Sequence, residues 1–147
     1  MENRFTHEYF MKKALQEAEF AFEQGEIPVG AVIVVDNKII ARTHNLTEVL
    51  NDVTAHAEMQ AITSAANFLG GKYLKGCTLY VTLEPCQMCA GALYWSQISK
   101  IIFGARDKQR GFMSMGTKLH PKTEIVSGVL AQASADLMLR FFASKRK

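Results

Sequence analysis

The sequence predicts an α/β protein, organised as a three-layer α/β/α sandwich around a five-stranded mixed sheet. Two observations indicate this fold class. Two β-branched runs near the start have the form of an antiparallel hairpin, and after them short strand-like runs alternate with helix-like stretches. The 147 residues, 48% of them hydrophobic, suffice for one core. We therefore expect one domain over residues 1–147.

The first predicted element is a helix. Thr6 is a suitable N-cap residue, because its hydroxyl can accept a hydrogen bond from the first helical turn. Apolar side chains then recur at helical spacing from Phe10 to Phe22. Gly25 is expected to end the helix, since glycine is common just past a helix C-terminus.

The hairpin is predicted next, with strands at residues 29–35 and 38–43. Both runs are rich in β-branched side chains, and the link between them is the two-residue segment Asp36-Asn37. Such a link favours a tight turn between antiparallel strands. The polar stretch 44–53 that follows is expected to be a loop.

The middle of the chain predicts helix, strand and helix in turn. A helix is expected from about 54 to 68, where Gly70-Gly71 stops it, and a strand at 78–83. Pro85 then suits the first position of a helix that reaches about Ser96, because a proline there has no hydrogen bond to lose.

The last third predicts two strands and a final helix. The strands are expected at 100–104 and 123–126, separated by a Gly/Met-rich loop at 105–122. The helix is expected at 130–144. Together with the hairpin and the strand at 78–83, these strands make up the five of the predicted sheet.

The composition favours a cytoplasmic protein without a membrane segment. The polar start is not followed by an apolar stretch of signal-peptide type, and the longest notable apolar run, 29–35, is too short to span a bilayer. Of the three cysteines, two form a C-x-x-C pair, which in a reducing compartment favours metal or redox chemistry over a disulfide. Cys77, within an apolar run, is expected in the core.

Charge is unevenly distributed along the chain. Residues 1–100 carry 8 Lys and Arg against 11 Asp and Glu, whereas residues 101–147 carry 9 against 3. A basic C-terminal third is compatible with binding a polyanion, and a solvated helix surface is the alternative. The cations concerned at the end of the chain are Arg140, Lys145, Arg146 and Lys147.

The most informative motifs are His56-Ala57-Glu58 and, further along, Pro85-Cys86-Gln87-Met88-Cys89. They supply one imidazole, two thiols and one carboxylate. A catalytic zinc site takes three protein ligands and keeps a fourth position open, while a hydrolytic site also needs a group that moves protons. His56, Cys86 and Cys89 are the predicted ligands and Glu58 the predicted catalytic residue, a combination found in zinc-dependent base deaminases.

Both motifs are expected in first helical turns, where backbone N–H groups and the helix dipole favour thiolate. Cys86 and Cys89, three apart, would share a helix face. His56 and Glu58, two apart, would not, unless the ion lies off the end of the helix. A structural zinc site and a thioredoxin-like redox site are the alternatives, although the first normally has four protein ligands and the second leaves His56 and Glu58 without a role.

Several segments carry a resemblance to the cytidine deaminase-like superfamily, and within it to the bacterial tRNA-specific adenosine deaminases. The match runs from about His7 to Lys145. The segments are residues 26–32 (EIPVGAV), Asn45, 54–58 (TAHAE), 79–92 (LYVTLEPCQMCAGA) and 103–107 (FGARD).

The resemblance implies a homodimer with one zinc ion per subunit that converts the wobble adenosine of a tRNA anticodon stem-loop to inosine and releases ammonia. It further implies that Ile27 and Val29 wall the purine, that Asn45 hydrogen-bonds it and that Asp107 lies by the neighbouring nucleotide. The C-terminal helix, with Phe141 and Phe142, would lie near the RNA.

Two departures define the alternative function. The loop at 111–116 (GFMSMG) is bulkier and shorter than the small-residue loop usual in the tRNA enzymes, and residues 92–95 (ALYW) are similar to bacterial guanine deaminases. Against the latter, their usual Cys-Glu-Pro-Cys reads Leu83-Glu84-Pro85-Cys86 here. Deamination of a free purine base such as guanine is thus the alternative, and a non-catalytic zinc-binding module is a further one.

Overall fold

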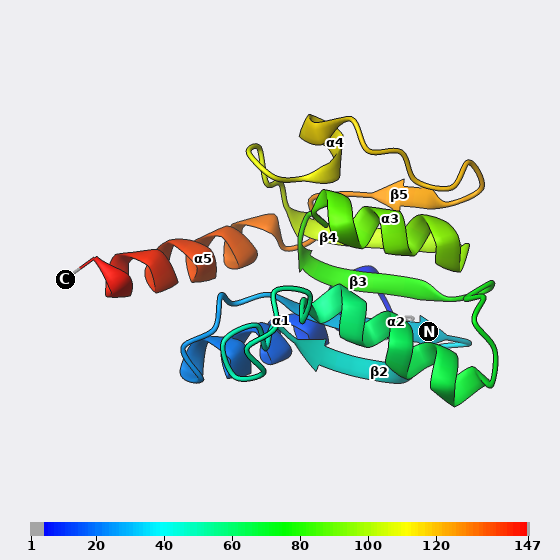
Figure 1. Ribbon diagram of the computed structural model, residues 1–147, viewed down its shortest axis with the longest axis horizontal. Helices are drawn as coiled ribbons and strands as arrows, with labels where there is room; N and C mark the ends of the chain where they lie inside the picture. Colours follow the sequence, from blue (N-terminus) through cyan, green and yellow to red (C-terminus); the bar gives the residue numbers. More distant parts are fainter. Residues whose placement is uncertain (1–4, 147) are drawn as a thin grey trace.

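The computed structural model describes residues 5–146, and within them the centre is a five-stranded sheet in the order β2-β1-β3-β4-β5 (Figure 1). β1 (Gly30–Val35) pairs antiparallel with both β2 (Lys38–His44) and β3 (Thr78–Leu83). β3, β4 (Lys100–Ala105) and β5 (Glu124–Val126) run parallel to one another. The predicted mixed sheet is confirmed.

Helices cover both faces of the sheet, which confirms the three-layer prediction. α2 (Ala57–Leu69) and α3 (Gln87–Ser96) pack on one face, and α1 (His7–Glu23) and α5 (Ala131–Lys145) on the other (Figure 1). The predicted burial of Cys77 is also confirmed, since it lies fully buried in the core under α2 and α3.

Local sequence explains the first elements. The Thr6 hydroxyl accepts a hydrogen bond from the backbone N–H of Tyr9 and caps α1, as predicted. Asp36 and Asn37 have φ values of 50° and 62°, the left-handed conformation that a two-residue hairpin turn requires at both positions. The turn aligns β1 with β2 and thereby brings the start of β1 beside the end of β2.

Two helices begin later than predicted. Asp52 accepts hydrogen bonds from the N–H and the hydroxyl of Thr54, and this local turn delays the start of α2 until Ala57. Cys86 is extended and forms a bridge with Gly111, so α3 begins at Gln87 and Pro85 precedes its N-cap. The Asp52 side chain before α2 and the bridge to Gly111 before α3 thus hold residues in non-helical conformations that the sequence pattern assigns to the helices.

The stretch 105–122, predicted as a loop, contains a short helix, α4 (Phe112–Met115). The backbone N–H of Met113, in the first turn of α4, donates to Glu84 Oε2 at 3.0 Å. A carboxylate from a distant segment thus takes the place of a local cap. The local sequence carries no sign of this bond.

The C-terminal ends of three strands lie at the same edge of the sheet. β2, β3 and β4 point in the same direction, because β2 and β3 are both antiparallel to β1 and β4 is parallel to β3. The segments that leave these three strands therefore start at a common edge, where β1 begins. Within residues 5–146, every helix is too short or too polar to cross a lipid bilayer.

Candidate metal centre and active site

Three side chains converge between the starts of α2 and α3. His56 is the N-cap residue of α2, Cys86 is the N-cap residue of α3, and Cys89 lies in the first turn of α3. One ligand atom from each lies within 4.8 Å of those of the other two. His56 Nδ1 is 3.6 Å from Cys86 Sγ and 3.5 Å from Cys89 Sγ. The structure therefore brings the three predicted ligands together.

The spacing of the cluster fits zinc. A tetrahedral ion with Zn–S bonds of about 2.3 Å and a Zn–N bond of about 2.0–2.1 Å requires the bound nitrogen and sulfur to be about 3.6 Å apart. The two nitrogen–sulfur distances, 3.6 and 3.5 Å, match that requirement. A set of one imidazole and two thiols also suits zinc better than magnesium or calcium, which prefer oxygen ligands. The residues present fit a zinc ion.

Glu58 lies beside this cluster and is 4% exposed. Burial raises the pKa of its carboxyl to about 7, although its own backbone N–H and the His56 ring act in the opposite direction. His56 precedes the helix with an extended backbone, at ψ 153°. Residues two apart face different sides only when both lie within a helix, and His56 lies outside α2. The side chains of His56 and Glu58 can therefore both face the proposed metal site.

The two thiols differ in acidity. Hydrogen bonding from Cys89, and then from His56, lowers the pKa of Cys86 to about 4. The same bond to Cys86, together with burial, raises the pKa of Cys89. Interaction with Cys86 likewise raises the pKa of His56. Both thiols bind a metal as thiolates, so binding of an ion here would release protons.

A cavity of about 670 Å³ opens over the cluster. His56, Cys86 and Glu58 lie in its wall, while Cys89 is fully buried behind them. The residues predicted to contact substrate line the same cavity: these are Ile27, Val29, Asn45 and Asp107. The structure therefore places all of the predicted site residues in or directly behind one cavity.

Asn45 and Asp107 also have structural hydrogen bonds. Asn45 is 6% exposed; its Nδ2 donates to the carbonyl of Ile27 at 3.3 Å and its Oδ1 accepts from the N–H of Thr47 at 3.3 Å. Asp107 Oδ1 accepts from the N–H groups of Gln109 and Arg110 at 3.2 and 3.0 Å. Both side chains are therefore held in place at the cavity wall.

Cations from the loop after β4 line the cavity as well. Arg106, Lys108 and Arg110 belong to the wall, and the Arg106 guanidinium pairs with Glu84 at 3.1 Å. These cations flank Asp107 in the sequence, a signal from which their place in the wall could have been predicted. The wall thus combines these three cations with the acidic Glu58, Glu84 and Asp107.

The C-terminal helix contributes apolar side chains to the wall, including Met138, Leu139 and Phe142. Phe141 is buried in the core, so the two neighbouring aromatic residues have different surroundings. Arg140 and Lys145 lie over the rings of Phe22 and Phe141, away from the cavity lining. Arg146 does not line the cavity either, and Lys147 is outside the described residues.

A buried carboxylate joins the loop after β4 to the segment that bears Cys86. Glu84 is 2% exposed, and its Oε1 accepts from the N–H of Asp107 at 3.0 Å while its Oε2 accepts from the N–H of Met113. Gly111 packs so closely that a Cβ there would overlap this carboxylate. Glu84 therefore fixes the cavity's basic loop relative to the metal cluster. The sequence showed Glu84 in a motif but not this contact.

Comparisons with known proteins agree with this site. Residues 4–105 match the family described as the cytidine and deoxycytidylate deaminase zinc-binding region. The tRNA-specific adenosine deaminase of Bacillus subtilis (strain 168) is 44% identical over 146 residues, which cover 95% of this chain and 91% of that protein.

Two solved structures are similar in fold and sequence. One, from a study of A-to-I editing by tRNA:A34 deaminases at the wobble position of transfer RNA, has a TM-score of 0.83 at 42% identity and covers 88% of this chain and 98% of its own. The guanine deaminase of Bacillus subtilis has a TM-score of 0.66 at 40% identity and covers 76% and 68%. With a fitting ligand set and near full-length relatives, the chain belongs to the zinc-binding family of cytidine and deoxycytidylate deaminases, whose reaction is hydrolytic deamination.

Proposed function

We propose that the protein is a zinc-dependent deaminase that converts the wobble adenosine of a tRNA anticodon to inosine and releases ammonia. One zinc ion per subunit would be held by His56, Cys86 and Cys89. The observation that carries the proposal is the common cavity, in which this ligand set, the buried Glu58 and a basic loop meet. The full-length similarity to tRNA-specific adenosine deaminases supports the choice of substrate.

The chemistry divides between the ion and the chain. Zinc bound at this site would lower the pKa of a bound water toward neutrality. Glu58, with a pKa raised to about 7, can accept a proton and return it at neutral pH. It would pass one proton of the attacking water to the ring nitrogen and the other to the amine, which leaves as ammonia. Adenosine and water thus give inosine and ammonia.

The remaining wall would orient the base. Ile27 and Val29 offer apolar surface to the purine ring. Asn45 lines the cavity and its amide would hydrogen-bond the base, with its orientation held by the bonds to Ile27 and Thr47. Asp107, on the basic loop, would lie beside the neighbouring nucleotide.

The cations of the loop after β4 favour a polyanionic substrate over a free base. Lys108 and Arg110 lie at the cavity, where they would contact phosphates of an RNA. A neutral purine base has no phosphate that these cations could bind. The similarity to guanine deaminases favours the alternative. Yet Tyr94 and Trp95, which carry part of that resemblance, do not line the cavity, and Trp95 is 76% exposed.

We include a homodimer in the proposal. Large apolar side chains are exposed on the layer that α2 and α3 form, with Phe68 at 67% and Trp95 at 76%, and Leu50 before α2 is 55% exposed. A dimer formed through this layer would cover these side chains. We further propose that the chain is a single domain and that it acts in the cytoplasm, where tRNA is found. Sedimentation of the purified protein would test the dimer.

The substrate is tested by measuring ammonia release from zinc-loaded protein. An anticodon stem-loop with the wobble adenosine is compared with the same stem-loop carrying guanosine there, and with free guanine, adenosine and cytidine. Release from the adenosine stem-loop alone is the expected result. Release from guanine with none from either stem-loop would instead identify a free-base deaminase.

A further inference from the structure

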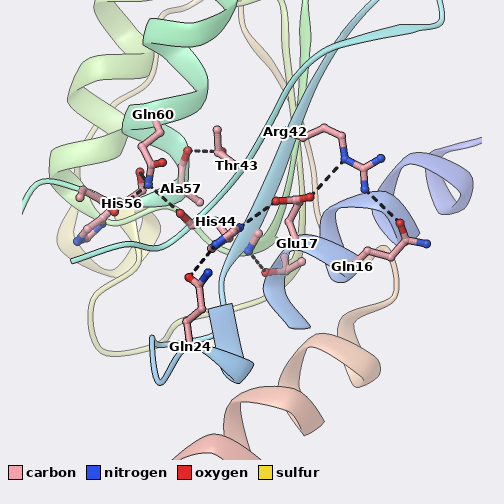
Figure 2. Close-up of polar contacts among 12 residues, drawn as sticks. Gln16, Glu17, Gln24, Arg42, Thr43, His44, His56, Ala57 and Gln60 are labelled. Carbon is pink, nitrogen blue, oxygen red and sulfur yellow. Dashed lines mark hydrogen bonds and ion pairs between the residues drawn. The ribbon is translucent and has the colours of Figure 1, made fainter. Parts of the chain in front are cut away.

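The backbone around His56 is held by two side chains outside the ligand set. Thr43, on β2, donates its hydroxyl to the carbonyl of Ala57 at 2.7 Å. Gln60, on the first turn of α2, donates its amide to the carbonyl of Ala55 at 3.1 Å and lies 3.5 Å from that of His56 (Figure 2). The carbonyls of Ala55, His56 and Ala57 thus all lie close to side-chain donors, and the middle carbonyl belongs to the proposed metal ligand.

Gln60 also binds the backbone at the end of β2. Its amide donates to the carbonyl of His44 at 2.8 Å (Figure 2). His44 ends β2 and directly precedes Asn45, which lines the cavity. One amide therefore connects the backbone beside the proposed base-binding residue with the backbone beside the proposed metal ligand.

The β2 end of this connection is itself anchored on α1. The His44 ring lies 2.9 Å from the carboxylate of Glu17, which is buried on α1, and Arg42 contacts the same carboxylate at 3.4 Å (Figure 2). Gln24 contacts the other nitrogen of the ring at 3.1 Å. Thr43 and the His44 carbonyl consequently belong to a fixed part of the molecule, against which the start of α2 can be held.

The start of α2 needs such support for a physical reason. His56 occupies the N-cap position but makes no capping hydrogen bond with its side chain, because its ring lies against the two cysteine sulfurs. The segment before it, residues 48–54, is exposed. Main-chain bonds hold part of this backbone, since the Leu46 N–H donates to the Ala55 carbonyl at 3.0 Å and the Gln60 N–H to the His56 carbonyl at 3.2 Å. Thr43 and Gln60 add the side-chain support that the uncapped helix start lacks.

We infer that Gln60 and Thr43 are positioning residues, which hold the His56 backbone where its ring can bind the metal. The inference rests on the proposed zinc site. Gln60 and Thr43 touch neither the ion nor the substrate. They act on the backbone that carries the His56 ring, in the way that hydrogen bonds to a metal-binding side chain orient that side chain. Loss of such an orienting bond typically lowers metal affinity about 10–100-fold.

Chelator competition on the purified protein measures the effect directly. Gln60→Met keeps the length of the side chain and removes its donors, and Thr43→Val keeps the shape and removes the hydroxyl. Thr43→Ser retains that hydroxyl and serves as the rescue variant. Gln132→Met makes the same exchange on the exposed face of α5, where Gln132 bonds only to Asp136 among the described contacts. A Co²⁺-loaded sample of each reports the ligand geometry through its absorption bands.

Zinc affinity is expected to fall about tenfold or more in Gln60→Met and Thr43→Val, with altered Co²⁺ bands, and to be restored in Thr43→Ser. Gln132→Met should match the unsubstituted protein. Unchanged zinc affinity and Co²⁺ bands in both Gln60→Met and Thr43→Val would overturn the inference. The assay needs no RNA, so a failure of the proposed substrate would appear separately, as absent deamination with normal zinc binding.

Discussion

His56 and Cys86 occupy equivalent positions, each as the last extended residue before a helix. Their side chains are free of capping bonds and meet between two helix N-termini, where backbone N–H groups and the dipoles stabilise thiolate. That His56, Cys86 and Cys89 meet at one place could be predicted from the sequence. Their extended backbone could not, because it depends on the bridge of Cys86 with Gly111 and on the turn at Asp52.

Replacing a ligand should remove the metal. In Cys89→Ala the cluster keeps two donors, so zinc affinity is expected to fall by more than the roughly 10–100-fold that loss of an outer partner costs. Metal content by mass spectrometry after chelator dialysis measures this. Cys77→Ala, a change to a cysteine outside the cluster, should retain its zinc. Full zinc retention in Cys89→Ala would reject the ligand set.

Gly111 is required by its close packing against Glu84. A Cβ at this position would overlap the carboxylate and the carbonyl of Asp107, so Gly111→Ala is expected to lower the free energy of unfolding by about 1–3 kcal/mol. Gly71→Ala, with open space around the added methyl, is the control. Urea denaturation compares the two. Equal stabilities would show that the Glu84 carboxylate does not require glycine opposite it.

Among the elements, those with local signals were predicted best. The strand at 78–83 has the predicted bounds, and the hairpin follows from the left-handed turn at Asp36-Asn37. α4 was missed because its first turn is held by Glu84, 29 positions earlier in the chain. Long-range hydrogen bonds of this kind leave no periodic pattern in a sequence.

The loop after β4 is the element that should bind the RNA backbone. Removing Lys108 and Arg110 by alanine substitution is expected to reduce the slope of log affinity against log salt by about 1.4–1.8, since each phosphate contact contributes about 0.7–0.9. Binding of the anticodon stem-loop at several salt concentrations measures the slope. The matched variant lacks two cations of the chain end, Lys145 and Arg146, which do not line the cavity.

The chain-end variant should change the salt slope less than the loop variant does. The sequence alone pointed to the basic C-terminal end, whereas the cavity wall points to the loop after β4. A larger change in the Lys145 and Arg146 variant would place the RNA backbone along α5 and contradict the assignment to the loop.

For the whole molecule, the metal would join parts of the fold that are far apart in sequence. His56 belongs to the start of α2, and the two cysteines belong to the start of α3, beyond β3. An ion that binds the folded chain alone stabilises it according to the ratio of its concentration to its Kd, by about 4 kcal/mol at a thousandfold excess. Chelation should therefore lower the thermal unfolding midpoint, and added zinc should restore it. An unaltered midpoint on complete zinc removal would contradict this.

The predicted site residues and the rest of the cavity wall differ in how far they could be predicted. His56, Cys86, Cys89 and Glu58 come from two short motifs, while the wall combines the ends of β2 and β4 with α5. Which face of α5 meets the cavity depends on packing against β4, so Met138 and Leu139 carried no signal of their own.

The central claim is that Glu58 moves protons at a zinc site without binding the ion. Its direct test is Glu58→Gln, with zinc content and inosine formation in the anticodon stem-loop measured on the same preparation. Zinc content equal to that of the unsubstituted protein, with inosine formation reduced at least about 100-fold, is the expected result. Inosine formation near the unsubstituted rate would remove Glu58 from the mechanism, and loss of zinc would make it a ligand.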